Sequence, residues 1–127
     1  MSQTEAINPQ ILDTFTQPLL EMKAEEVVLL DLRGGIAEFA DYFIICTGNS
    51  DIQVRAIADA LVERGKADGQ RPLNIEGYDQ RTWILIDFVD VVVHIMQPDE
   101  RKFYGLERLW GDAPVHEIED TPVAEAP

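Results

Sequence analysis

The chain has 127 residues, of which 46% are hydrophobic and 27% are charged, and its formal net charge at pH 7 is −14. This length and composition predict one globular domain and exclude a chain that is disordered throughout. The longest apolar runs are far shorter than the roughly 20 residues of a transmembrane helix, so no membrane partner is expected. Broad contact with nucleic acid is disfavoured, because phosphate binding relies on clustered Lys and Arg. The charge favours a basic protein as the partner.

The N-terminal region and the cysteine content indicate the compartment. The first arginine is Arg33, and no positively charged start leads into an apolar stretch, so we expect a cytoplasmic protein. Cys46 is the only cysteine and cannot form an intrachain disulfide. It lies in an apolar run, where a buried thiol is expected rather than a reactive one.

The first half of the chain predicts a helix, two strands and a second helix. Apolar residues at helical spacing between residues 11 and 20 indicate an N-terminal helix within residues 1–23, and Pro18 predicts a kink or break in it. Residues 26–32 and 41–47 are apolar and predict buried strands. Ser50 and Gln53 match a capping box, which predicts a long helix that ends at Gly69.

The second half predicts three strands and one more helix. Residues 73–76, 82–88 and 91–96 are separated by short turns and indicate an antiparallel meander. A short helix is expected from Pro98 to Gly111, with Phe103, Leu106, Leu109 and Trp110 on its apolar side. The expected fold is α/β, with a mixed five-stranded sheet and flanking helices in the order α-β-β-α-β-β-β-α. We expect residues 24–112 to form this domain and residues 113–127 to be a disordered acidic tail.

One strand–helix turn has the features of a phosphate site. The segment from Thr47 to Asp51 combines a Gly-containing turn with a helix start, where backbone amides and the helix dipole favour anions. Gly48 and Ser50 also have purely local roles in the turn and the cap. Neither a P-loop nor a G-x-G-x-x-G pattern is present, and Gln53 stands where a second magnesium-binding carboxylate would be needed. A nucleotide-handling transferase is therefore the alternative hypothesis.

The remaining residue types predict no enzyme, metal site or cofactor. His94 and His116 are the only histidines, and one usable His with one apolar Cys cannot supply the ligands of a zinc site. A Ser hydrolase is disfavoured because the G-x-S-x-G pattern is missing. We therefore expect no catalytic residues and no bound cofactor.

Alternation along two strands separates the faces of the sheet. Trp83, Leu85 and Asp87 share a face, and His94 and Met96 lie on one face of the next strand. A face that combines an indole, a carboxylate and an imidazole is typical of a partner surface. Alternatively, the first or the last helix covers this face.

These segments together resemble the ribosomal silencing factor (Iojap) family. The resemblance runs in order from about residue 27 to residue 114. It is carried by residues 40–50 (ADYFIICTGNS), 54–59 (VRAIAD), 76–78 (EGY), 83–87 (WILID), 90–96 (DVVVHIM) and 103–114 (FYGLERLWGDAP).

The resemblance implies a fold related to nucleotidyltransferases that lacks their active site. It also implies a translation repressor that binds ribosomal protein L-fourteen on the large ribosomal subunit and sterically blocks association with the small subunit when nutrients are short. Little direct contact with nucleic acid and a homodimer in the free state are expected. The interaction surface carried over from the family consists of Tyr78, Trp83, Leu85, Asp87, His94 and Met96, with Asp41, Ser50 and Arg55 as further polar contacts.

Overall fold

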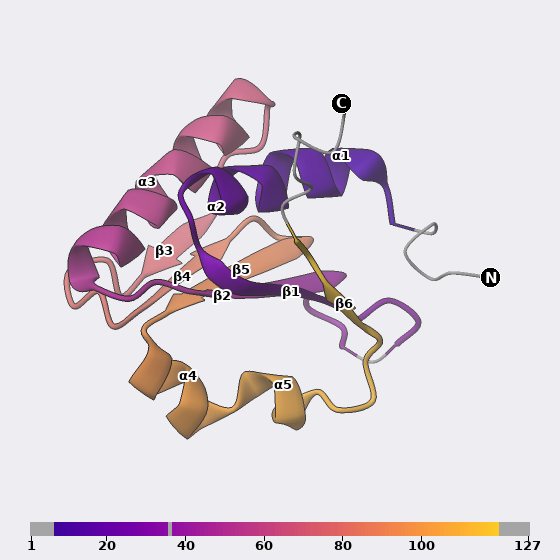
Figure 1. Ribbon diagram of the computed structural model, residues 1–127. Helices are drawn as coiled ribbons and strands as arrows, with labels where there is room; N and C mark the ends of the chain where they lie inside the picture. Colours follow the sequence, from indigo (N-terminus) through magenta and orange to yellow (C-terminus); the bar gives the residue numbers. More distant parts are fainter. Residues whose placement is uncertain (1–6, 36, 120–127) are drawn as a thin grey trace, which may run out of the picture.

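The computed structural model describes residues 7–35 and 37–119. One mixed sheet forms its centre, with strand order β3-β4-β5-β2-β1-β6. The strands are β1 (Glu25–Asp31), β2 (Tyr42–Thr47), β3 (Asn74–Glu76), β4 (Trp83–Asp87), β5 (Val91–Met96) and β6 (Val115–Glu117). The helices are α1 (Pro9–Ile11), the π-helix η2 (Leu12–Thr16), α2 (Gln17–Glu21), α3 (Asp51–Ala67), α4 (Pro98–Tyr104) and α5 (Leu106–Leu109). Figure 1 shows α1, α2 and α3 on one side of the sheet and α4 and α5 on the other.

The pairing of the strands confirms the predicted mixed sheet and its meander. Strands β3, β4 and β5 pair antiparallel in sequence, and β5 pairs parallel with β2. Helix α3 lies in the crossover that joins the parallel neighbours, as parallel pairing requires a long connection. The register places Trp83 opposite Met96 and Leu85 opposite His94, so these four side chains share one face.

The N-terminal helix is interrupted, as Pro18 predicts. A regular helix would need an amide hydrogen at Pro18, which proline lacks. The helix instead widens into η2, whose last bond runs from the Gln17 amide to the carbonyl of Leu12. A new α-helix then begins with Pro18 in its first turn, where the missing donor costs nothing.

The predicted cap of α3 is confirmed in detail. The Ser50 hydroxyl accepts a hydrogen bond from the Gln53 amide at 3.1 Å. The Gln53 side chain reaches back, but its acceptor oxygen bonds the amide of Asn49 at 2.7 Å rather than that of Ser50. Gly69 follows the helix with φ +81°, the left-handed conformation expected of a helix terminator.

The C-terminal region differs from the prediction in two ways. The single expected helix is two short helices, because Gly105 adopts φ +54° between them and ends α4. Residues 115–117 form a sixth strand, whose His116 is paired with Leu29 of β1, so the predicted count of five strands is wrong. Disorder was expected from residue 113 onwards, but Ala113 is buried and Ile118 packs against the core. Residues 120–127 of that expected tail lie outside the described residues.

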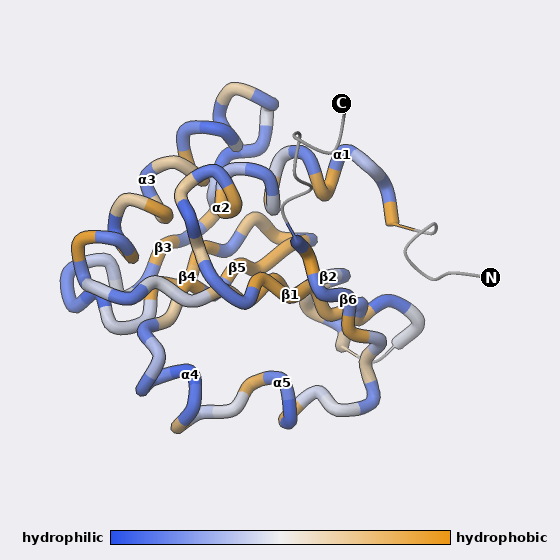
Figure 2. Tube along the Cα trace, viewed as in Figure 1, coloured by the Kyte–Doolittle hydropathy of each residue, from blue (hydrophilic) through white to orange (hydrophobic). Residues whose placement is uncertain are grey.

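Two hydrophobic cores lie on opposite faces of the sheet. The first core, which we call the α3 face, is covered by α3 and the N-terminal helices and is mainly aliphatic. The second, the α4–α5 face, lies between the sheet and the segment of α4 and α5. In Figure 2 the central strands are strongly hydrophobic and much of α4 and α5 is hydrophilic. Cys46 is buried in the first core, which raises its pKa to about 12. Among the described residues, no helix combines the length and apolar character of a membrane span.

Candidate protein-interaction site

Three side chains of β4 form a half-buried row on the α4–α5 face. Trp83, Leu85 and Asp87 alternate with the buried Ile84 and Ile86, as the period of two predicts. We call the three outward residues the Trp83 row. Because β4 is flanked by the short strand β3, this part of the face extends beyond the buried centre of the sheet. The row combines an aromatic, an aliphatic and an acidic group on one rigid strand.

His94 and Met96 lie behind this row and do not reach the surface. His94 is 4% exposed and Met96 is fully buried. Both were expected at the partner contact, but in this structure the second core encloses them. The sequence left two interpretations of this face open, a partner surface or a face covered by a helix. For His94 and Met96, coverage by the last helical segment is correct. Their side chains support the Trp83 row from beneath.

One hydrogen bond connects His94 to the row and fixes its tautomer. The Trp83 indole Nε1 donates to His94 Nδ1 at 3.1 Å. An indole nitrogen can only donate, so the proton of neutral His94 lies on Nε2. This Nε2 is buried and has no hydrogen-bond partner among residues 7–35 and 37–119. Burial lowers the pKa of His94 to about 4, so the imidazole is neutral at pH 7.

A chain of aromatic contacts crosses the α4–α5 face. Trp83 packs against His94 and Tyr104, with ring centroids 5.9 and 4.8 Å apart. His94 contacts Phe43, which in turn contacts Trp110. Tyr104 is half exposed, so the accessible aromatic surface extends from Trp83 onto α4. Tyr104 belongs to the segment 103–114 that carries the family resemblance. Alternation along the strands could not predict that Tyr104 lies beside Trp83.

The apolar side predicted for the last helix is only partly correct. Leu106 and Trp110 pack against the second core, as expected. Phe103 and Leu109, however, are 79% and 70% exposed. The left-handed Gly105 breaks the helix between them, so positions before and after it no longer follow one helical period. The break leaves two large apolar side chains on the outer surface of this segment.

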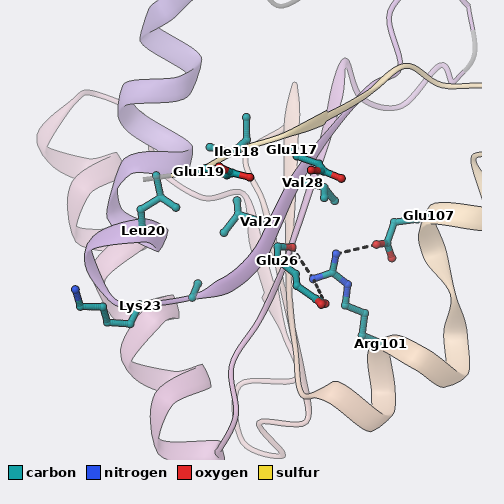
Figure 3. A pocket seen from close by; sticks show the side chains of 11 residues that line it. Leu20, Lys23, Glu26, Val27, Val28, Arg101, Glu107, Glu117, Ile118 and Glu119 are labelled. Atoms are coloured by element: carbon teal, nitrogen blue, oxygen red, sulfur yellow. Dashed lines mark hydrogen bonds and ion pairs between the residues drawn. The ribbon is translucent and has the colours of Figure 1, made fainter. Parts of the chain in front are cut away.

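Arg101 fastens α4 to the sheet. Its Nη1 donates to the carbonyl of Glu26 at 2.7 Å and to the hydroxyl of Thr47 at 2.9 Å, while its Nη2 donates to Glu107 at 2.7 Å. Glu26 has φ +51° in an irregular part of β1, and the guanidinium stabilises that conformation. Figure 3 shows Arg101 pointing toward both Glu26 and Glu107. Arg101 carries no recognisable signal in the sequence, because its partners come from distant parts of the chain.

The hollow beside Arg101 does not have the character of an anion site. It has a volume of about 690 Å³ and lies between α2, β1, β6 and α4 (Figure 3). Four carboxylates contribute to its lining, from Glu26, Glu107, Glu117 and Glu119. The guanidinium that could attract a phosphate is already engaged by protein oxygens. The hollow is therefore a boundary between elements and is separate from the Trp83 row.

The four other predicted contact residues lie away from the row. Tyr78 packs against the first core on the α3 face, where its hydroxyl donates to Asp59 at 2.8 Å and accepts from Arg55 at 2.9 Å. Asp41 precedes β2, and Ser50 caps α3 after the other end of that strand. The structure thus brings together five of the nine predicted residues and places the rest at three other locations.

The strand–helix turn is occupied by its own local hydrogen bonds. The amides of Asn49 and Gln53 are both bonded within the cap, and the Thr47 hydroxyl accepts from Arg101. Within residues 7–35 and 37–119, no group of three or more His, Cys, Asp or Glu is arranged to hold a metal ion. The hydrogen bonds within the protein therefore explain why these residue types occur in the turn, and no bound phosphate is needed for that explanation.

Comparison with known proteins identifies the family. The family model "Ribosomal silencing factor during starvation" matches residues 5–127. The chain belongs to the ribosomal silencing factor family. It is 46% identical over 112 residues to ribosomal silencing factor RsfS of Halalkalibacterium halodurans, covering 88% of this chain and 95% of that protein. It is also 46% identical over 99 residues to RsfS of Bacillus subtilis, covering 78% and 83%.

A solved structure and a more distant relative extend the comparison. The fold is similar to a Chromobacterium violaceum protein with TM-score 0.77 and 29% identity, covering 91% of each chain. The mouse "Mitochondrial assembly of ribosomal large subunit protein 1" is 37% identical over 75 residues, which are 57% of this chain and 33% of that protein. The family membership predicted from the sequence is confirmed, and with it a role in translation regulation.

Proposed function

We propose that this chain binds the large ribosomal subunit through ribosomal protein L-fourteen and sterically blocks the small subunit, repressing translation under nutrient limitation. Membership of the ribosomal silencing factor family supports the silencing role. The name of the mouse relative, which refers to the large ribosomal subunit, supports the choice of subunit. The chain acts in the cytoplasm as a binding protein, without turnover or cofactor. Homodimer formation by the free chain stays a prediction.

The observation that carries this proposal is the accessible Trp83 row. Binding energy at protein interfaces is concentrated in a few aromatic and aliphatic groups that are already held in place. Trp83 is held by His94 and Tyr104, and Leu85 lies beside it on the same strand. No large rearrangement is needed to present these groups. Burial of Leu85 and the exposed edge of the indole would supply most of the apolar contact.

Charge supports a protein partner rather than RNA. The net charge of −14 repels phosphate, whereas ribosomal proteins are generally basic. Asp87 places a carboxylate at one end of the row, and one of its oxygens already accepts the amide of Val89 at 2.8 Å. The other carboxylate oxygen of Asp87 is the one that would pair with a Lys or Arg of the partner protein. Contact with RNA is accordingly minor in this proposal.

A nucleotide-handling transferase is less well supported. The turn from Thr47 to Asp51 uses amides of its own for capping, and the nearby guanidinium of Arg101 is engaged. An ancestral relation to nucleotidyltransferases stays a prediction. A thermal-shift experiment with nucleoside triphosphates and magnesium tests the alternative, because a bound ligand would raise the melting temperature. An unchanged melting temperature at millimolar nucleotide would reject it.

Order-of-addition sedimentation tests the proposed function. Purified large subunits are mixed with a saturating excess of the chain before small subunits are added, and joined ribosomes are measured on a gradient. We expect the joined fraction to fall and the chain to sediment with the large subunit only. Chain added after joining should act more slowly, because the partner surface is then covered. Undiminished joining at saturation would reject steric blocking.

A further inference from the structure

A groove on the α3 face lies opposite the Trp83 row. It has a volume of about 500 Å³ and runs between α3 and the outer strands β3 and β4. Its floor is apolar and consists of Ala58 and Val62 from the helix and Ile75 and Ile86 from the strands. Tyr78 also lines it, held by hydrogen bonds to Asp59 and Arg55. The groove is therefore a preformed apolar surface with a fixed aromatic wall.

The strand beside the groove is a free edge. Within the described part of the chain, β3 is the outermost strand of the sheet and pairs with β4 only, and all three of its residues are exposed. Ile75 is 38% exposed although it belongs to the groove floor, and Leu73 just before the strand is also exposed. A very short edge strand is one way in which proteins prevent unwanted pairing. That protection explains the length of β3, but it does not explain the apolar floor beside it.

The rim of the groove carries two carboxylates, of which Asp59 already accepts a hydrogen bond from Tyr78 and lies 3.8 Å from Arg55. Asp59 and Glu63 lie one helical turn apart on α3 and both line the groove. Side chains at this separation are about 5–6 Å apart at Cβ. Same-side residues of an extended strand repeat every ~6.8 Å, which is close to that separation. Lys66, one turn further on, is the only basic side chain among the described lining residues.

We propose that this groove binds an extended segment of a basic protein, which adds to the free edge of β3. An aliphatic side chain of the segment covers Val62 and Ile75. Lys or Arg at neighbouring same-side positions pairs with Glu63 and with Oδ2 of Asp59, where it competes with the 3.8 Å ion pair between Asp59 and Arg55. This mode combines backbone bonds from strand addition with specificity from alternate side chains. A second copy of the chain is less suited to this groove than a basic segment, because its net charge of −14 opposes the carboxylates of the rim. The homodimer predicted for the free chain would use another surface.

A peptide selection tests both the site and the chemistry of its occupant. A displayed library of random eight-residue peptides is selected against the chain and counter-selected against Ile75→Glu, which places a charge on the groove floor. We expect enriched peptides in which aliphatic and Lys or Arg residues alternate with other residues. The binding of such a peptide should weaken roughly tenfold with Glu63→Lys, because attraction becomes repulsion.

Two controls separate this site from the Trp83 row. Ile75→Val keeps the apolar floor and should retain peptide binding, while Leu85→Glu changes only the opposite face and should leave peptide affinity unchanged. Melting curves of all four variants verify that each is folded. The outcome for the groove is thus independent of whether the Trp83 row binds ribosomes.

Three results would overturn the proposal. One is the absence of any peptide that distinguishes the chain from folded Ile75→Glu. Another is an enriched set without basic residues, or one whose binding is unaffected by Glu63→Lys. The third is self-association of the chain in analytical ultracentrifugation that Ile75→Glu abolishes, since a second copy would then cover the groove.

Discussion

The two faces of the sheet are covered by helices of very different length. The α3 face is covered by a helix of 17 residues, whose buried positions include Ile57 and Leu61. The α4–α5 face is covered by helices of seven and four residues, separated by the left-handed Gly105. Large apolar side chains, such as Phe103 and Leu109, remain exposed on that second cover. The same strands thus support one core that is closed by a long helix, apart from the groove at its outer edge, and one partly open surface.

This difference separates stability from binding. The α3 face consists mainly of aliphatic side chains, together with the Phe15–Phe88 ring pair, and they contribute stability through burial and close packing. The α4–α5 face is rich in aromatic rings and contains the unpaired Nε2 of His94, a cost that a core optimised only for stability would avoid. We infer that the interior of the first face mainly stabilises the fold and that the second face presents the surface proposed to bind the ribosome. The groove at the outer edge of the first face is a separate site. The following predictions test that division.

The largest expected effect is on stability, at the α3 face. Leu61 is fully buried, so Leu61→Ala should lower the free energy of unfolding by about 3 kcal/mol. The matched change Leu109→Ala removes the same atoms from an exposed position on α5 and should cost less than about 0.5 kcal/mol. Urea unfolding measures both values. Similar losses for the two variants would contradict the contrast between the faces.

His94 should make stability depend on pH. Its pKa is lowered to about 4 from the ordinary value of 6.5 because burial disfavours the imidazolium. Between these values the unfolded chain binds more protons, so the free energy of unfolding falls as pH falls from 6.5 toward 4, by at most about 3 kcal/mol. His94→Gln keeps an acceptor for Trp83 and should remove this part of the slope. Parallel pH profiles for the two proteins would show that His94 is not buried as described.

Trp83→Ala should mainly affect binding. Loss of the indole from the row should weaken binding to the large subunit by about 2 kcal/mol, as expected for an aromatic interface residue. A smaller loss of stability is also expected, because His94 Nδ1 loses its donor. Cosedimentation with a dilution series gives the affinity, and melting curves give the control. Unfolding of the variant would instead assign Trp83 to the core.

Charge reversal at Asp87 should have the smallest effect, and one that depends on salt. Asp87→Lys places a positive charge beside a basic partner and should weaken association most at low ionic strength. The isosteric Asp87→Asn serves as the control, since it retains the turn hydrogen bond to Val89. An affinity that is the same for both variants at every salt concentration would remove Asp87 from the contact.

Local patterns in the sequence were sufficient to predict most of the fold. Alternation predicted the faces of β4, and the capping residues Ser50 and Gln53 predicted the start of α3. Pro18 predicted the interruption that became η2. Each of these features depends on neighbours in the chain. Strand β6 was missed because three residues carry almost no periodic signal, and its pairing with β1 is a tertiary contact.

The site was less predictable than the fold for the same reason. Alternation placed His94 and Met96 on the correct face, but their burial depends on the path of α4 and α5 after Gly105. Tyr78 lies in the turn after β3, where alternation gives no guidance, and it lies on the opposite face. Arg101 contacts Glu26 and Thr47 across long sequence separations. Contacts of this kind require the three-dimensional arrangement.

The most direct test of the account is the binding of two surface variants to purified large ribosomal subunits. Leu85→Glu places a charge within the Trp83 row, and Val115→Glu makes the same kind of change on β6, at the opposite edge of the sheet. Val115 is 49% exposed and Leu85 is half-buried against the second core, so melting curves verify that both variants are folded. In a cosedimentation titration, we predict that Val115→Glu binds like the unchanged chain and that Leu85→Glu loses roughly tenfold or more in affinity. If a folded Leu85→Glu binds the large subunit as tightly as the unchanged chain, the Trp83 row is not the ribosome-binding surface.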